Sequence, residues 1–357
     1  MKVVAVVGTV GLPACYGGFE TLVDNLTKLS SKEIKYYVFC SASAYRMKMK
    51  SVNNADLIYI PLKANGYQSI FYDIWSLLKC FYLKPDVILV LGVSGCIFLP
   101  VLKIFNKARV VVNVDGLEWR RDKWSNITKR FLKISEKLAV KFSDVIISDN
   151  EAISDYIYTE YNKKSVTIAY GGDHIFPENM IFAEDSIDDY YFSVCRIEPE
   201  NNVHIVLDAF SQCMEKLVFV GNWANSAYGI QLKENYRKYN NIILLDPIYD
   251  KDKLFSLRAK SKGYIHGHSA GGTNPSLVEA MNSKTAIFAF DCIFNRYSLE
   301  NKGEYFTCAE SLRDVIERQT VNSLLNNAQE TYAIANEKYQ WLKIVKHYEK
   351  LFCSEKY

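Results

Sequence analysis

The strongest constraint on the fold is an alternation of short β-branched runs with longer amphipathic stretches, which occurs twice along the chain. The first series of such runs lies at residues 2–7, 35–40, 56–62, 86–91, 108–114, 144–148 and 165–170, and the second extends from residues 190–195 to 285–290. Amphipathic patterns separate most of the runs. Strands joined by helices of this length favour parallel sheets covered on both faces. We therefore expect an α/β protein with two doubly wound domains in series.

The length of the chain agrees with two such domains. Its 357 residues are about twice the usual domain length. Glycines 171 and 172, with Pro177 and the acidic residues that follow, are typical of a linker. We expect an N-terminal domain, a linker, a second domain and a C-terminal helix at residues 1–172, 173–189, 190–335 and 336–357. The helix should present one apolar face made of Tyr339, Leu342, Val345, Tyr348 and Leu351.

Charge and cysteine usage exclude several classes of protein. The 43 basic and 40 acidic residues give a net charge of +3, which is too small for a general nucleic-acid binder. The nine cysteines include no CxxC pair, so we expect buried free thiols in a reducing cytoplasm rather than a disulfide framework or a metal site. The N-terminus has no signal-peptide pattern. The protein is therefore expected to be cytoplasmic.

The longest apolar run, residues 87–103, is interrupted by Gly92, Ser94, Gly95 and Pro100. This pattern favours a buried strand, a turn and the start of a helix. A transmembrane span is the alternative.

A glycine-rich segment, GTVGLPACYGGFE (residues 8–20), follows the first predicted strand and opens a helix. Backbone N–H groups near Gly17 and Gly18, together with the helix dipole, could face an anion there. The alternative is a purely structural turn. The segment lacks the GxGxxG pattern, no carboxylate ends the second strand, and no Gly-Lys-Ser/Thr follows. These absences exclude a dinucleotide fingerprint and a P-loop.

A second candidate anion site lies in YIHGHSAGGTNPSLVEAMNSK (residues 264–284). Asn274 is predicted to be an N-cap and Pro275 the first helical residue. Glu279, about one helical turn further on, could reach a sugar hydroxyl, or it could form a surface salt bridge. The candidate ligand-binding residues of this segment are Gly271, Gly272, Thr273, Asn274, Ser276 and Glu279.

Two histidines, His266 and His268, lie at the end of the strand with which this segment begins. Each could be a catalytic residue or a hydrogen-bonded structural residue. Their i, i+2 spacing without a nearby third ligand is a weak metal signal, so no metal site is predicted.

Four blocks together carry a family resemblance: GTVGLPACYGGFETLVDNL, VDGLEWRRDKW, CRIEPENNVHIVLDAF and HGHSAGGTNPSLVEAM. With them, the chain resembles the GT-B glycosyltransferases of retaining family 4, and most closely the bacterial surface-polysaccharide rhamnosyltransferase subgroup. The resemblance implies two Rossmann-like domains facing a cleft. The first would bind the acceptor and the second the nucleotide sugar, and the C-terminal helix would pack back on the N-terminal domain.

The resemblance also assigns roles to residues of the second domain. Glu279 corresponds to the second of two glutamates that lie eight residues apart in the family, and it would bind the ribose. Gly271 stands where the first should be, so the backbone of residues 271–274, or His266 or His268, would contact the donor sugar instead. Arg196 would bind the donor diphosphate through its planar fork, unless it is an ordinary surface cation. Asn201 stands at the position of the family's diphosphate lysine.

The block VDGLEWRRDKW (residues 114–124) follows a strand of the first domain. The resemblance places Asp115 and Glu118 near the sugars, and Gly17 and Gly18 near the diphosphate and sugar of the donor. The block could instead be a solvated loop. The residues assigned to the acceptor are Glu20, Arg120, Arg121, Lys123 and Trp124.

The function implied is retaining transfer of a sugar, with L-rhamnose from dTDP-rhamnose favoured, to an undecaprenyl-diphosphate-linked glycan of O-antigen or capsule. No cofactor is implied, because the nucleotide sugar is a substrate. The enzyme would be peripheral on the inner face of the cytoplasmic membrane. Basic and aromatic segments at residues 67–84 and 128–142 agree with this location, although core packing would also explain them. The alternatives are another nucleotide hexose, a sugar-nucleotide epimerase or hydrolase, and a non-catalytic binding protein.

Overall fold

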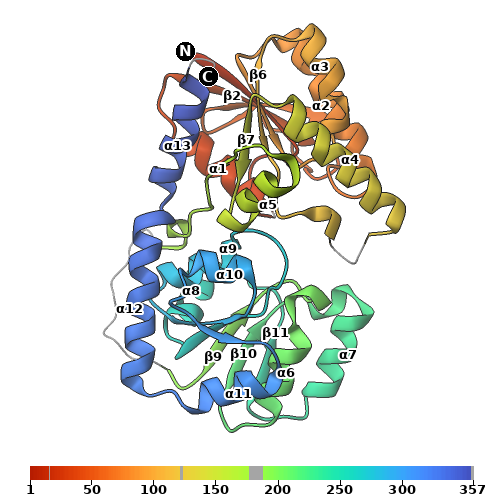
Figure 1. The fold of residues 1–357 in the computed structure, drawn as a ribbon. Helices are drawn as coiled ribbons and strands as arrows, with labels where there is room; N and C mark the ends of the chain where they lie inside the picture. Colours follow the sequence, from red (N-terminus) through yellow and green to blue (C-terminus); the bar gives the residue numbers. More distant parts are fainter. Residues whose placement is uncertain (16, 121–123, 177–187, 355–357) are drawn as a thin grey trace. The chain divides into compact units, whose positions relative to one another are not determined.

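The computed structural model describes residues 1–15, 17–120, 124–176 and 188–354. The chain divides into two compact units (Figure 1). The first unit contains Met1–Tyr170 and the chain from Trp341 onward, and the second contains Gly171–Gln340. Of the expected linker, Asp173–Ile175 form a short 3₁₀ helix, η3, within the second unit. The Pro177 end of that linker lies outside the described residues.

The first unit is built on an eight-stranded sheet with the order β3-β4-β2-β1-β5-β6-β7-β8. All pairs are parallel except β3 with β4, which is antiparallel. The strands are β1 Lys2–Val7, β2 Ile34–Ser41, β3 Ser51–Val52, β4 Ala55–Ile60, β5 Val87–Leu91, β6 Arg109–Asn113, β7 Val145–Ser148 and β8 Val166–Thr167.

Helices cover both faces of this sheet. They are α1 Gly18–Leu29, α2 Gln68–Leu83, η1 Cys96–Phe98, α3 Leu99–Phe105, η2 Glu118–Arg120, α4 Asn126–Phe142, α5 Glu151–Tyr161 and α13 Trp341–Cys353. The connection through α1, from β1 to β2, moves toward one edge of the sheet. The connections through α2, α3 and α4, from β4 to β5, β6 and β7 in turn, move toward the other edge. Right-handed crossovers therefore place α2, α3 and α4 on the face opposite α1. In agreement, α2 contacts α3, α3 contacts α4, and α13 contacts α1.

The second unit contains a six-stranded, fully parallel sheet with the order β11-β10-β9-β12-β13-β14. Its strands are β9 Tyr191–Val194, β10 Leu217–Val220, β11 Ile242–Leu245, β12 Gly263–His266, β13 Ala286–Phe290 and β14 Glu304–Phe306. Its helices are η4 Pro199–Asn201, α6 Val203–Ser211, η5 Trp223–Asn225, α7 Ala227–Tyr236, α8 Lys251–Ala259, α9 Pro275–Asn282, α10 Ile293–Ser298, α11 Ala309–Glu317 and α12 Val321–Lys338.

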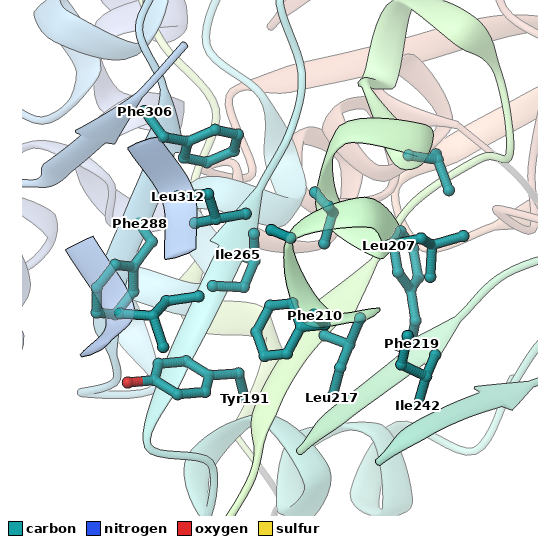
Figure 2. Close-up of a cluster of buried hydrophobic side chains, with 14 of the residues drawn as sticks. Tyr191, Leu207, Phe210, Leu217, Phe219, Ile242, Ile265, Phe288, Phe306 and Leu312 are labelled. Carbon is teal, nitrogen blue, oxygen red and sulfur yellow. The ribbon is translucent and has the colours of Figure 1, made fainter. Parts of the chain in front are cut away.

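The core of the second unit is a cluster of buried aromatic and aliphatic side chains (Figure 2). Tyr191 of β9 meets Phe210 of α6 and Phe288 of β13 edge to face, with ring centroids 5.7 and 5.5 Å apart. Continuous apolar strands are expected in a sheet that helices bury on both sides. This core holds β9 and β12, whose carboxyl ends carry the candidate donor residues.

Both sheets reverse their strand order at one point. The reversal lies between β1 and β5 in the first unit and between β9 and β12 in the second. In open parallel sheets, ligands bind outside the carboxyl ends of the strands at such a switch point. The first glycine segment follows β1, and the segments with Arg196 and His268 follow β9 and β12. The structure thus places the predicted motifs at the two switch points.

The end of the chain differs from the single helix expected over residues 336–357. Helix α12 ends at Lys338 and α13 begins at Trp341, and this break changes the phase of the buried face. The expected Leu342 is exposed, whereas Val345 and Tyr348 are buried as expected. The full set of buried residues in α13 is Trp341, Ile344, Val345, Tyr348 and Phe352. Helix α13 contacts the rest of the first unit; its Glu349, for example, accepts a hydrogen bond from the Ser31 N–H at 2.6 Å.

Residues 87–103 form β5, a turn and the beginning of α3, as the interruptions in the sequence predict. Over the described part of the chain, no helix combines the length and apolar character needed to span a membrane. All nine cysteines are free thiols, but only a third of them are buried as expected. Those that are buried are Cys40, Cys80 and Cys96, those that are partly buried are Cys195, Cys213 and Cys292, and those that are exposed are Cys15, Cys308 and Cys353.

Asp73 is a buried carboxylic acid on α2, and its side chain accepts a hydrogen bond from the Ser94 hydroxyl. Burial raises the pKa of Asp73 to about 7, against the hydrogen bonds from Ser94 and Gly95, which lower it. Because the folded state then holds a proton that the unfolded chain releases near pH 4, the contribution of Asp73 to stability falls as the pH rises from about 4 to 7.

We predict that Asp73→Asn removes this pH dependence. Between pH 5 and pH 8, the free energy of unfolding should fall by about 2.5 kcal/mol more in the wild type than in Asp73→Asn. Urea denaturation at the two pH values measures the difference. Equal pH dependence in the two proteins would show that Asp73 titrates normally.

Candidate active site

Arg196 and Asn201 lie in the loop that follows β9. Arg196 is 45% exposed, and its Nη1 lies 3.8 Å from Oε1 of Glu198, so a solvent-accessible cation lies at the carboxyl edge of the sheet. Asn201 is buried, and its amide donates to the backbone oxygen of Arg196 at 2.7 Å. At the expected diphosphate-lysine position, therefore, the side-chain amide fixes the loop that carries Arg196.

The loop after β12 is bound to the loop after β9. Both the N–H and the hydroxyl of Ser269 donate to the backbone carbonyl oxygen of Glu200, at 3.1 and 2.9 Å. Asn202 donates to the Gly267 oxygen at 2.9 Å. A Cβ added at Gly267 would lie 2.2 Å from the Asn201 oxygen, so only glycine allows this close approach. The structure thus brings the Arg196 and His268 segments together at the switch point.

His266 is the last residue of β12 and is fully buried. Its ring stacks on that of His268, with centroids 4.4 Å apart and planes inclined by 14°. Burial lowers the pKa of His266 to about 3, and neither ring nitrogen of His266 has a hydrogen-bond partner in the described part of the chain. His266 is therefore neutral at physiological pH and cannot act as a general acid there. No group of three or more potential metal ligands occurs among the described residues.

The start of α9 confirms the predicted cap. The Asn274 side chain accepts from the Ser276 N–H at 3.1 Å and from the Ser276 hydroxyl at 2.8 Å, and Pro275 is the first helical residue. Thr273 is buried, whereas a Cβ added at Gly271, which has a φ of +113°, would meet no atom within 4 Å. Gly271 and Gly272 therefore lead to the positive end of the α9 dipole with an open backbone at Gly271.

Glu279 forms a salt bridge, one of the two alternatives from the sequence, but its partner is the buried Arg258 rather than a surface cation. Its Oε2 accepts from Nη2 of Arg258 on α8 at 2.8 Å, and its Oε1 lies 3.4 Å from Nε2 of His174. Burial raises the pKa of Glu279, but the charge of Arg258 and the hydrogen bond from His174 outweigh it, so the pKa lies below its usual value. Glu279 is thus a carboxylate with an internal counter-ion. Its remaining lone pairs can still accept from a sugar hydroxyl.

The first glycine segment surrounds a carboxylate of its own. Gly17 is the N-cap of α1 with a φ of +107°, and Gly18 is the first helical residue. The buried Glu20 accepts from the Thr9 hydroxyl at 2.9 Å and from the Val10 N–H at 2.7 Å. Burial raises the pKa of Glu20, while these hydrogen bonds lower it. A Cβ at Gly17 would lie 2.3 Å from Oε2 of Glu20. The group that fills the space beside Gly17 is therefore the carboxyl of Glu20, which was expected to bind the acceptor.

The segment after β6 carries Asp115 and Glu118. Asp115 has a φ of +59° and its N–H donates to Asn113 at 3.0 Å. Oε1 of Glu118 accepts from the Trp124 indole N–H at 3.0 Å. The segment is thus a tightly turned loop with its own polar contacts. Arg121 and Lys123, which were assigned to the acceptor, lie outside the described residues.

An aromatic cluster that the sequence does not predict packs between η2, α4 and α5. Its buried centre, Glu136 of α4, accepts from Trp119 at 3.1 Å, from Tyr156 at 2.7 Å and from Tyr161 at 2.6 Å. The Lys133 ammonium lies 4.6 to 5.1 Å from the centroids of the same three rings. Lys133 was expected on a membrane-facing surface, but cation–π contacts and the Glu136 charge hold it in this cluster.

Arg120 extends the aromatic cluster toward solvent. Its guanidinium lies 5.2 Å from the ring centroids of Trp119 and of Tyr156. Of the basic residues assigned to the acceptor, Arg120 is therefore one whose position the fold restrains.

Comparison with known families identifies the second unit. Residues 180–341 match the family described as glycosyl transferases group 1. The second unit carries a glycosyltransferase domain. Residues 1–173 match a domain of unknown function (DUF1972). No curated protein matches the chain.

Solved structures show that the glycosyltransferase domain and the first unit together have the GT-B fold, as the sequence predicts. Sucrose-phosphate synthase from Thermosynechococcus elongatus is similar, with a TM-score of 0.81 at 14% identity over 99% of this chain and 98% of that one. HepE of Anabaena in complex with UDP-glucose gives a TM-score of 0.73 at 14% identity over 99% and 100%. A glycosyltransferase from Rickettsia africae gives 0.71 at 11% identity over 98% and 97%.

Proposed function

We propose that the protein is a retaining glycosyltransferase that moves a sugar from a nucleotide-sugar donor to a glycan carried on a lipid diphosphate. The observation that supports this most strongly is the arrangement at the switch point of the glycosyltransferase domain. There the half-exposed Arg196 lies in the loop after β9. The loop after β12 is hydrogen-bonded to that loop and leads to the capped start of α9. A cation and a helix N-terminus that follow neighbouring strands at the same edge of the sheet suit a diphosphate leaving group.

The donor would bind along α9. Arg196 and the α9 dipole would face the diphosphate, and Glu279 would accept from the ribose. Because Gly271 replaces the family's first glutamate, the open backbone at residues 271–274 and His268 would contact the donor sugar. The crystal structures of HepE with UDP and with UDP-glucose support a nucleotide sugar as the class of donor. Within that class we favour dTDP-rhamnose on the resemblance of the sequence.

The reaction requires charge stabilisation more than a protein nucleophile. The bond from the anomeric carbon to the diphosphate oxygen breaks, and a bond to the acceptor oxygen forms on the same face. The acceptor proton passes to the departing phosphate oxygen. Arg196 and the α9 N-terminus would stabilise the negative charge as it develops, and the loops would hold the two substrates in the reactive geometry. The buried, neutral His266 would hold the His268 ring by stacking on it and would transfer no proton.

The acceptor would bind the first unit. Asp115, Glu118 and Trp124 follow β6 at the carboxyl edge of its sheet, and Arg120 lies beside them. We propose an undecaprenyl-diphosphate-linked glycan of O-antigen or capsule as the acceptor. This implies a peripheral enzyme on the inner face of the cytoplasmic membrane. The contact between Trp124 and Glu118 would position the carboxylate near the acceptor hydroxyl.

Donor consumption, measured with and without a lipid-diphosphate acceptor, tests the proposal. A transferase releases nucleoside diphosphate only when the acceptor is present. Turnover that is independent of the acceptor would identify a hydrolase or an epimerase. Donor binding without any turnover would identify a binding protein.

Arg196→Ala should lower the rate of transfer by more than tenfold, because one charge-assisted contact to the diphosphate is lost. Arg196→Lys should lose less, since it keeps the charge but not the bidentate geometry. Arg237→Ala is a matched control, because this exposed arginine ends α7 at the opposite edge of the sheet. If Arg196→Ala transfers as fast as Arg237→Ala, Arg196 does not bind the diphosphate.

A further inference from the structure

Helix α2 of the first unit exposes a continuous apolar stripe. Its members are spaced four, four, three and four residues apart, which places them on one side of a helix. Trp75 and Leu78 are nearly half exposed, and Tyr82 is 89% exposed. The stripe consists of Tyr67, which precedes the helix, and of Phe71, Trp75, Leu78 and Tyr82. Such a row is unusual on a helix whose opposite side already packs on a sheet.

The neighbouring helix α3 continues the apolar surface. Ile104 and Phe105 are 73% and 72% exposed, and Val101 is 43% exposed. Helix α3 contacts α2, and both lie on the same face of the sheet. We call the stripe on α2 and these three residues of α3 the apolar face. Soluble monomers rarely expose so many large apolar side chains together.

The exposed charged side chains of helices α2, α3 and α4 are all basic. Helices α2, α3 and α4, all fully described, contain only two carboxylates, Asp73 and Glu136, and both are buried. Helix α4 presents basic residues to solvent at the spacing of one helix side, together with the exposed Ile127 and Ile134. These basic residues are Arg130, Lys137 and Lys141. The nearby Asp144 is paired with Lys103 at 2.6 Å.

The apolar face is connected to the candidate acceptor segment. The ring of Tyr67, at the start of the stripe, meets the Trp124 ring edge to face with centroids 6.4 Å apart. The Trp124 indole in turn donates to Glu118 at 3.0 Å. A surface that covers the apolar face would therefore lie next to the residues expected to receive the acceptor sugar.

We propose that the apolar face docks on an anionic lipid bilayer. Its aromatic and aliphatic side chains would enter the interfacial layer, and Arg130, Lys137 and Lys141 would contact anionic headgroups. Exposed carboxylates would oppose such contact, and these three helices have none. Docking would hold the Glu118 segment where a lipid-linked acceptor projects from the membrane, and this role rests on the proposed function.

Sedimentation with lipid vesicles tests the docking without donor or acceptor. The protein should bind vesicles that contain phosphatidylglycerol at least tenfold more tightly than vesicles of phosphatidylcholine alone. Phe71→Ser/Trp75→Ser should weaken binding to the anionic vesicles by more than tenfold. Arg130→Glu/Lys137→Glu should remove the preference for anionic lipid. The matched control, Ile230→Ser/Tyr249→Ser, changes two exposed apolar residues of the second unit and should bind like the wild type.

Two outcomes would overturn the docking proposal. One is equal binding by the wild type and by Phe71→Ser/Trp75→Ser. The other is a dimer in sedimentation velocity that this same variant dissociates, because the apolar face would then cover a second copy of the chain. A short-chain, water-soluble acceptor separates this result from the proposed function. Phe71→Ser/Trp75→Ser should transfer a sugar to this acceptor at the wild-type rate. If the wild type binds vesicles but transfers no sugar, only the proposed function is contradicted.

Discussion

Glu279→Ala should lower the free energy of unfolding by about 3 to 5 kcal/mol, because it leaves Arg258 as a buried cation without its partner. The Arg258 side chain is 1% exposed and donates to Glu279 at 2.8 Å. The resemblance alone predicts that this substitution removes transfer and leaves the fold intact. The ion pair changes that expectation, since one carboxylate would serve both the fold and the donor. Urea denaturation of the single variant measures the loss.

A double variant separates the two roles of Glu279. In Arg258→Met/Glu279→Leu both charges are replaced by apolar groups, so most of the lost stability should return. Transfer should stay more than tenfold below the wild type, because the ribose has still lost its acceptor. Wild-type stability in Glu279→Ala would contradict the buried pair. Wild-type transfer in the double variant would contradict the ribose contact.

Glu136→Ala should destabilise the first unit by about 3 to 5 kcal/mol, because the loss of a buried carboxylate leaves its charged and neutral donors unpaired. Three side chains of the aromatic cluster donate to Glu136, and the Lys133 ammonium lies 3.4 Å from Oε1. Glu136→Gln keeps an acceptor oxygen and should lose less. Because Trp119 belongs to η2, the alanine variant should also loosen the Glu118 segment and reduce transfer. Chemical denaturation and the transfer assay measure the two effects.

Glu160→Ala is the matched control for this cluster. Glu160 also pairs with Lys133, at 3.1 Å, but it is 45% exposed, and exposed ion pairs contribute about 1 kcal/mol or less. If Glu136→Ala costs no more than Glu160→Ala, Glu136 is not the centre of the cluster.

Much of the fold can be predicted from the sequence, because it depends on local periodicity. The β-branched runs at residues 2–7 and 86–91 become β1 and β5, and Asn274 caps α9 as its residue type predicts. Strand β3 and the break between α12 and α13 are examples of what could not be predicted. The strand β3 has two residues and exists through its pairing with β4. The break between α12 and α13 follows from packing against different units, which local periodicity does not encode.

The candidate site is predicted less completely, because its polar partners are far apart in the sequence. Asn274 could be found from the helix that it precedes, and Arg196 from the resemblance of its block. Arg258 gives no sequence signal, since it is an ordinary arginine on α8 until the fold places it against Glu279. Glu20 shows the opposite problem. Its position in a glycine-rich segment indicates a ligand contact, yet its side chain turns inward to Thr9 and Val10.

The most direct test of glycosyl transfer is mass spectrometry of a lipid-diphosphate acceptor after incubation with the protein and a panel of dTDP- and UDP-sugars. We predict that the acceptor gains the mass of one sugar residue, with dTDP-rhamnose as the favoured donor, and that one nucleoside diphosphate is released for each sugar transferred. An unchanged acceptor with every donor, under conditions in which the protein is folded and binds nucleotide, would contradict the assignment as a glycosyltransferase.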